Sequence, residues 1–142
     1  MKIRNLFMVV SFAAGMSAMS LSPSYAQSSD TVQEVQNQSF FKKKYRIKGS
    51  WSLEQRDGNF VIKFSDSFST KNGPDLKVFL SPQSASSLSD RNALNGALKL
   101  GVLKTNKGGQ EYVIPAGTDL SQFSSVIVHC EAYSVLWGGG SL

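Results

Sequence analysis

The sequence predicts an all-β protein, an antiparallel β-sandwich of short strands with at most one short helical turn. Apolar and polar residues alternate over residues 44–53 and again over residues 60–65, which is the period of a half-buried strand. Turn-forming residues separate several such runs, and no long segment has helical periodicity. Many short strands at regular spacing are typical of a sandwich.

The start of the chain, residues 1–26, is interpreted as a signal peptide. Two cations, Lys2 and Arg4, precede an apolar run that is too short for a membrane-spanning helix. Small residues at Ser24 and Ala26 fit the pocket of a signal peptidase, which would cut after Ala26. We therefore expect an exported protein, periplasmic or secreted, with no transmembrane segment after cleavage.

The chain after the signal peptide is predicted to be one domain behind a short leader. Residues 27–39 are mostly Gln, Ser, Asn and acidic residues. Such a segment buries too little apolar surface to offset its chain entropy, so we expect a flexible polar leader. Residues 40–142 have a length that suits a single domain with one core.

The domain is expected to open with a hairpin. Apolar side chains at alternate positions of residues 44–53 lie on one face, and lysine, arginine and serine lie on the other. Arg56-Asp57-Gly58-Asn59 is a tight-turn sequence, and the alternation resumes over residues 60–65. The two runs therefore predict a pair of antiparallel strands.

The middle of the domain is predicted to alternate between loops and short strands. Residues 66–75 form a loop that ends in Asn-Gly-Pro-Asp, a turn-forming sequence, and residues 76–80 form a short strand. Residues 81–90 are rich in serine and are predicted to be a surface loop. Residues 94–103 are predicted to be extended.

The last third of the domain contains the most apolar segment. A turn at residues 107–109 precedes a predicted strand at residues 112–114, and residues 119–123 could form one turn of helix. Residues 126–130 are then predicted to be a buried strand, followed by a glycine run at residues 138–140.

Several functional classes lack support in the sequence. The formal net charge of +5 falls by two when the signal peptide is removed, which is too mild an excess to indicate specific nucleic-acid binding. No hydrolase or nucleotide motif is found, and the spacing of Asp66, Asn72 and Asp75 matches no calcium loop. We therefore predict no metal site and a monomer, and an enzyme with turnover is the least expected class.

A stripe of cations lies on the polar side of the first predicted strand. Its members are Lys42, Lys44, Arg46 and Lys48. Lysines of this kind protect an edge strand from sheet-to-sheet aggregation. The same stripe could instead contact an anionic partner, such as phosphates, an acidic polysaccharide or an acidic redox protein.

Five short sequence blocks follow one another along the domain. They are Gly49-Ser50-Trp51, Asn72-Gly73-Pro74-Asp75-Leu76, Leu100-Gly101-Val102-Leu103-Lys104, residues 109–115, and Val126-Ile127-Val128-His129-Cys130 followed by Tyr133-Ser134-Val135. In this order they resemble the DM-thirteen (DM13) domain family over residues 45–142. The resemblance implies a β-rich fold and an electron-transfer or redox role, and such domains sometimes accompany DOMON domains.

The single cysteine of the chain, Cys130, matches the family's characteristic cysteine. The resemblance implies that Cys130 acts in redox chemistry, as a bare thiol or as a thiolate ligand to a prosthetic group such as haem. A free cysteine on an apolar strand is equally typical of a hydrophobic core. The alternative function is therefore a non-catalytic, extracytoplasmic binding or interaction module in which Cys130 is only a core residue.

A haem site at Cys130 is restricted by the strand around it. Neighbouring side chains of a strand point to opposite faces, so His129 and Cys130 reach one iron only if a bulge interrupts the strand. No Cys-x-x-Cys-His motif is present, which excludes covalent c-type haem, and all four methionines lie in the signal peptide. A non-covalently bound haem is the candidate cofactor that remains. We expect Trp51, Tyr133 and Trp137 to shape the pocket around the thiol.

Overall fold

The computed structural model describes Gly15 and residues 36–142. Apart from Gly15, the predicted signal peptide therefore lies outside the described residues, as does most of the predicted leader. The last two leader residues, Gln38–Ser39, form the first strand of the domain. Within the described ranges, no helix has the length and apolar character needed to cross a bilayer.

The described part of the chain folds into short antiparallel strands and one 3-10 turn, which confirms the predicted all-β class. The strands are β1 (Gln38–Ser39), β2 (Phe41–Lys42), β3 (Ile47–Lys48), β4 (Ser50–Arg56), β5 (Asn59–Phe64), β6 (Ser69–Thr70), β7 (Leu76–Ser81), β8 (Leu98–Val102), β9 (Gln110–Val113), β10 (Ser125–Cys130) and β11 (Val135–Ser141). One sheet has the order β1-β4-β5-β9, a second has the order β2-β11-β10-β7-β8, and β3 pairs with β6. The predicted helical turn is the 3-10 turn Leu120–Gln122, which Asp119 caps by accepting a hydrogen bond from Ser121 N.

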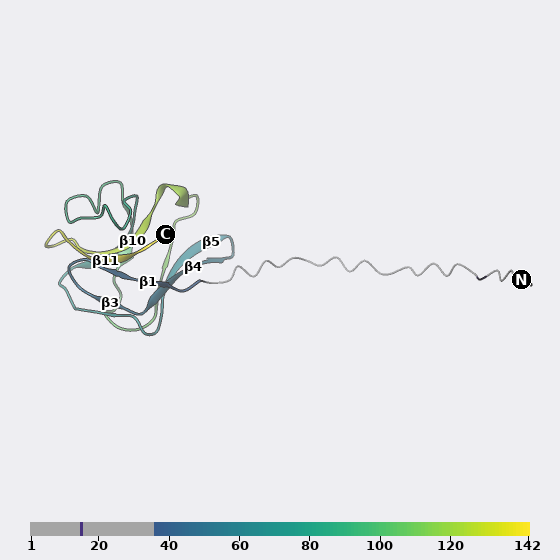
Figure 1. Cartoon of the computed structure of the whole chain (residues 1–142), viewed down its shortest axis with the longest axis horizontal. Helices are drawn as coiled ribbons and strands as arrows, with labels where there is room; N and C mark the ends of the chain where they lie inside the picture. Colours follow the sequence, from purple (N-terminus) through teal and green to yellow (C-terminus); the bar gives the residue numbers. More distant parts are fainter. Residues whose placement is uncertain (1–14, 16–35) are drawn as a thin grey trace, which may run out of the picture. The chain divides into compact units, whose positions relative to one another are not determined.

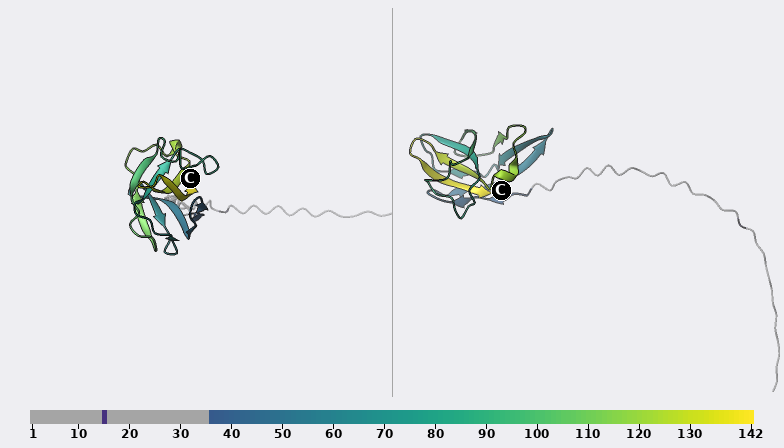
Figure 2. Two further views of the ribbon diagram at one scale, coloured as in Figure 1. Left: turned by 90° about the vertical axis from the view of Figure 1, so that its left-hand side faces the viewer. Right: turned by 90° about the horizontal axis from the view of Figure 1, so that it is seen from above.

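The two larger sheets pack against each other around the main core, as in the predicted sandwich (Figure 2). Buried residues of β4, β5 and β9 meet buried residues of β7, β10 and β11 in this core. Its largest fully buried side chains include Trp51, Phe64, Phe68 and Ile62. Each fully buried side chain of this size stabilises the fold by roughly 1.5–3 kcal/mol.

The predicted first strand is divided in two at Gly49. Residues on either side of it enter different sheets: β3 pairs with β6, whereas β4 pairs with β5 and β1. Gly49 has a φ of +88°, and a Cβ there would lie 2.7 Å from the backbone nitrogen of Phe68. The chain therefore makes its change of sheet at a residue that only glycine suits.

The predicted hairpin is present after this break. β4 and β5 run side by side (Figure 1), with Trp51 opposite Phe64 and Arg56 opposite Asn59. The turn residues Asp57 and Gly58 both have positive φ, at 49° and 79°. This conformation matches the right-handed twist of two antiparallel strands, which explains the tight-turn sequence.

β10 is the central strand of the second sheet and is buried along its whole length. It pairs with β7 on one edge and with β11 on the other, and the pair of β10 and β11 is labelled in Figure 1. Val126, Val128 and Cys130 belong to the main core, while Ile127 belongs to a second cluster on the outer face of the sheet. Both faces of β10 are therefore covered.

The segment between β7 and β8 covers this outer face. Its side chains Leu88 and Ala93 are buried against Ile127. Ser81 Oγ donates to the carbonyl oxygen of Ala93 at 2.8 Å, and Asp90 Oδ1 accepts a hydrogen bond from Leu136 N at 2.7 Å. Only Leu98–Val102 of the predicted extended region forms a strand, because the preceding residues turn back over the sheet.

The glycine run of β11 is explained by close packing. A Cβ at Gly140 would overlap Nε1 of the buried Trp51, and a Cβ at Gly138 would lie 2.7 Å from the carbonyl oxygen of Phe41. Trp51 Nε1 is itself buried without a hydrogen-bond partner. The indole of one sheet thus lies directly against the bare backbone of the other.

We predict that Gly140→Ala destabilises the domain by about 1–3 kcal/mol, because the new methyl group displaces the Trp51 ring in a close-packed core. Guanidinium denaturation measures the change. The matched control is the exposed neighbour Ser141→Ala, for which we expect a change within about 0.5 kcal/mol. Equal stability of the two variants would contradict the contact.

Candidate functional site

Cys130 is the last residue of β10 and lies inside the main core. It is opposite Leu76 on β7 and Val135 on β11. Its exposed fraction is 0%, and it has no disulfide partner. The core cluster that contains it is built almost entirely from aliphatic and aromatic side chains. The thiol is therefore closed to direct contact with a partner molecule in this conformation.

His129 lies on the opposite face of the same strand. The pairing of β10 with β7 is regular, with His129 opposite Lys77 and Cys130 opposite Leu76. A register shift does occur between β10 and β11, where Val128 faces Gly138 and His129 faces Leu136. The extra residue belongs to β11, so β10 remains regular and its neighbouring side chains still alternate.

His129 is a buried polar side chain without hydrogen bonds. Its exposed fraction is 1%, and neither Nδ1 nor Nε2 has a partner. The ring packs edge-on against Phe79, with centroids 6.2 Å apart. Burial lowers the pKa of His129, and the negative charges of Asp90 and Glu131 offset this only in part. The imidazole is therefore neutral at pH 7.

The aromatic surroundings of the thiol differ in part from the prediction. Trp51 and Trp137 belong to the same core cluster as Cys130. The expectation for Tyr133 is wrong: it is 69% exposed, because it lies in the turn between β10 and β11, where the chain leaves the sheet. Tyr45 lies in the core's outer layer instead and packs against Trp137.

Tyr45 and Trp137 form a contact that connects this core to the surface. Their ring centroids are 4.2 Å apart at an interplanar angle of 47°. Trp137 Nε1 donates to the carbonyl oxygen of Lys71 at 3.2 Å, and Lys71 Nζ lies 4.8 Å from the centroid of the Tyr45 ring. The sequence places Tyr45 on the apolar side of the first predicted strand, but it does not predict the contact with Trp137.

The surroundings of Cys130 do not fit a haem. Cavities of 250, 370, 380 and 500 Å³ occur in the described part, and Cys130 lines none of them. Apolar side chains from both sheets fill the space around the strand that carries the thiol. His129, the other proposed ligand, faces the second cluster. A haem would need both sheets to move apart.

Metal ligands are likewise not gathered at one point. Over residues 36–142, no group of three or more His, Cys, Asp and Glu side chains is placed to hold a metal ion.

The predicted basic stripe becomes two neighbouring basic cavities. Lys42, Arg46 and Lys48 line the cavity of 500 Å³, and Lys42 and Lys44 line the cavity of 380 Å³. Lys42 lies on β2, at the edge of its sheet, so the edge-protection role also applies. The chain bends between β2 and β3, and this bend spreads the four cations over both cavities.

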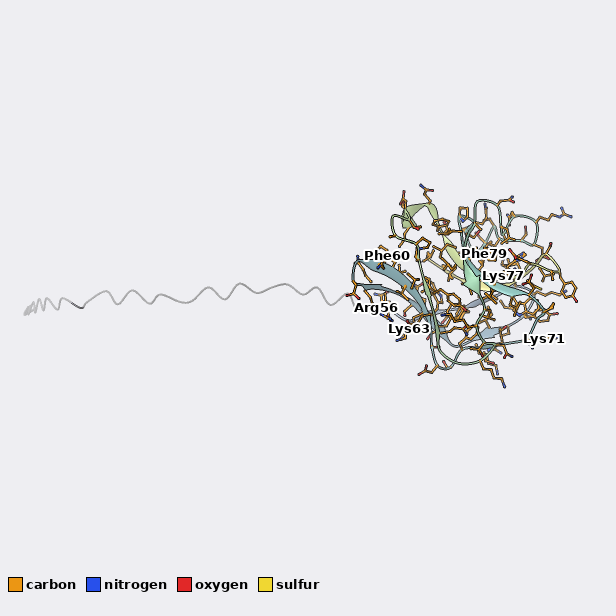
Figure 3. The ribbon with its side chains drawn as sticks, turned by 180° about the vertical axis from the view of Figure 1, so that it is seen from behind. Arg56, Phe60, Lys63, Lys71, Lys77 and Phe79 are labelled. Atoms are coloured by element: carbon orange, nitrogen blue, oxygen red, sulfur yellow. The ribbon has the colours of Figure 1, made fainter. Side chains whose placement is uncertain are left out.

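Most of the acidic side chains near strands are paired elsewhere. Arg56 contacts Glu54 and Glu111, and Lys77 contacts Asp75 and Glu131. Arg56 lowers the pKa of both glutamates through hydrogen bonds. Arg56 and Lys63 lie at the end of the domain opposite Lys71 (Figure 3).

In a comparison with known proteins, the family model described as "Electron transfer DM13" matches residues 39–140, which include Cys130, His129 and the cations of the basic stripe. No curated protein and no solved structure matches the chain significantly.

We predict that the domain loses stability as the pH falls from about 7 to about 5, because His129 is neutral when buried but takes up a proton when unfolded. Its pKa is lower in the folded state than its usual 6.5, so the unfolded state binds more protons in this range. The carboxylates with lowered pKa, such as Glu131, contribute mainly below about pH 5, since their usual pKa is 4.5. His129 is the only histidine of the chain.

The measurement is urea denaturation at several pH values for the wild type and His129→Leu. The variant should show a flat free energy of unfolding over this range. A slope that is the same in both proteins would contradict the assignment to His129.

Proposed function

This chain belongs to the electron-transfer DM13 family, and we propose that it is an exported electron-transfer domain whose redox site is the bare thiol of Cys130. The observation that supports this assignment is the position of the thiol. It is the sole cysteine of the chain, and the central strand of the family-matched domain holds it in the core. The family description supplies the class of function, and the residues supply the site.

The buried position favours outer-sphere electron transfer over thiol chemistry that needs contact. Thiol–disulfide exchange requires one sulfur to attack another, and oxidation to a sulfenic acid requires access for the oxidant. Neither reaction is open to Cys130 in this conformation, since its side chain has no exposed surface. In the proposed step, the sulfur gives one electron to an external one-electron acceptor, and the thiol loses its proton, which must cross the packed core to reach solvent. Reduction returns one electron and one proton.

The proposal includes export. Its support is the sequence of residues 1–26, where a charged start, an apolar run and small residues precede the expected cleavage after Ala26. The destination is the periplasm or the external medium.

A second candidate function is a binding or interaction module in which Cys130 is only a core residue. The observation that favours it is the same burial, because cysteines enclosed by apolar side chains are usually inert. The two candidates differ in one property: only the first requires the domain to exchange electrons through Cys130.

We predict that protein-film voltammetry of the exported domain gives a one-electron wave that is absent in Cys130→Ser and Cys130→Ala. The control is Val128→Ala, which removes core volume from the same face of β10 and keeps the thiol. It should lose stability and retain the wave. A wave in all four proteins would place the redox site elsewhere, and no wave in the wild type would favour the binding module.

A further inference from the structure

We propose that the cations between β2 and the end of β3 form a docking surface for an acidic redox protein. We call this surface the basic face, and its members are Lys42, Lys43, Lys44, Arg46 and Lys48. The inference rests on the proposed electron-transfer function, since it names the kind of partner from which the domain receives or to which it gives an electron.

All five cations line one of two adjoining cavities. Lys42, Arg46 and Lys48 line the cavity of 500 Å³, and Lys42, Lys43 and Lys44 line the cavity of 380 Å³. Lys42 is common to both, so the cavities are neighbours. Five positive charges on one short segment produce a concentrated field at one place on the surface.

These charges are not neutralised within the described part of the domain. Its acid–base contacts within 4.0 Å involve Arg56, Lys63, Lys77 and Lys99, and none involves the basic face. Asp90 is the one carboxylate among the residues that line the two cavities. Its Oδ1 atom accepts a hydrogen bond from Leu136 N. Most of the positive charge of the basic face is therefore available to a partner.

The basic face also lies over the aromatic contact that leads to the core of Cys130. Tyr45 lies in the middle of the cationic segment and packs against Trp137, which belongs to the same cluster as the thiol. Lys71 adds a further cation above the Tyr45 ring. A partner that docks here lies next to Tyr45, which contacts Trp137 of the core cluster that contains Cys130.

The shape of the basic face favours a protein over a linear polyanion. The larger cavity combines cations with Phe40, which is partly exposed, whereas the other apolar lining residues, Ile47 and Leu136, are buried. An apolar side chain among cations fits protein side chains, and the carboxylate of Asp90 in the smaller cavity disfavours a polyanion such as a polysaccharide or a row of phosphates. Redox proteins meet through small, charge-steered interfaces of this kind.

The test uses the full exported domain, with ¹⁵N-detected NMR as the readout and two probes. The first probe is hexacyanochromate(III), a redox-inert paramagnetic trianion that broadens the signals near its binding site. The second is an acidic peptide of alternating glutamate and leucine. Both probes should change the NMR signals of residues 40–49 and of Leu136. Broadening spread evenly over all surface cations would overturn the proposal.

Matched variants separate this face from the total charge. Lys42→Gln/Lys44→Gln should weaken peptide binding about tenfold, since each exposed ion pair contributes modestly. Lys63→Gln/Lys99→Gln removes the same charge from β5 and β8, where both lysines contact glutamates, and should change binding less than about twofold. Equal weakening by the two pairs would contradict a specific face.

A heparin hexasaccharide provides the competing outcome. If it occupies the same residues at lower concentration than the peptide does, the partner is an anionic polysaccharide and the proposal is wrong. Binding is read without any redox signal, so the two hypotheses fail separately. If the probes do not bind the basic face but the Cys130 wave is observed, the docking proposal alone is wrong. If the probes bind the basic face but no wave is observed, the proposed redox site alone is wrong.

Discussion

The structure depends on the burial of β10 on both faces. This strand pairs with β7 and β11 at its two edges, and all six of its residues are buried. Its alternating side chains supply the main core on one side and the outer cluster on the other. Since neighbouring side chains on a strand point to opposite faces, the same constraint separates Cys130 from His129. The thiol of Cys130 faces the sandwich interior, and the imidazole of His129 faces the outer cluster.

The burial of Cys130 limits the chemistry that we propose for it. A sealed thiol excludes reactions in which the sulfur touches a substrate, so the role that we propose for it is electron transfer through packed side chains. The close contact between Trp51 and the bare backbone at Gly140 keeps the two sheets together around it. Trp137 and Tyr45 connect this interior with the surface at the place where the cations gather. The proposed redox site and the proposed docking surface are therefore connected by one pair of packed aromatic side chains.

The sequence pattern predicted the fold where local periodicity determines it. Alternation predicted β4, β5 and β10, and the turn residues predicted the hairpin and the 3-10 turn. The change of sheet at Gly49 was missed, because glycine fits the apolar side of an alternating run and its need for positive φ depends on the approach of Phe68. The exposure of Tyr133 was missed since alternation does not show where a strand ends. The contact of Tyr45 with Trp137 joins distant parts of the chain through the extra residue in β11, which no local pattern reveals.

The most direct test of the central claim is sulfur K-edge X-ray absorption of the chain from Gln27 onward. The four methionines precede this point, so Cys130 supplies the only sulfur atom and the spectrum reports on that residue alone. The account predicts that the absorption edge shifts when the domain is poised oxidised and shifts back on reduction. An unchanged edge in a domain that demonstrably takes up and releases an electron would contradict it, because the electron would then reside on another group.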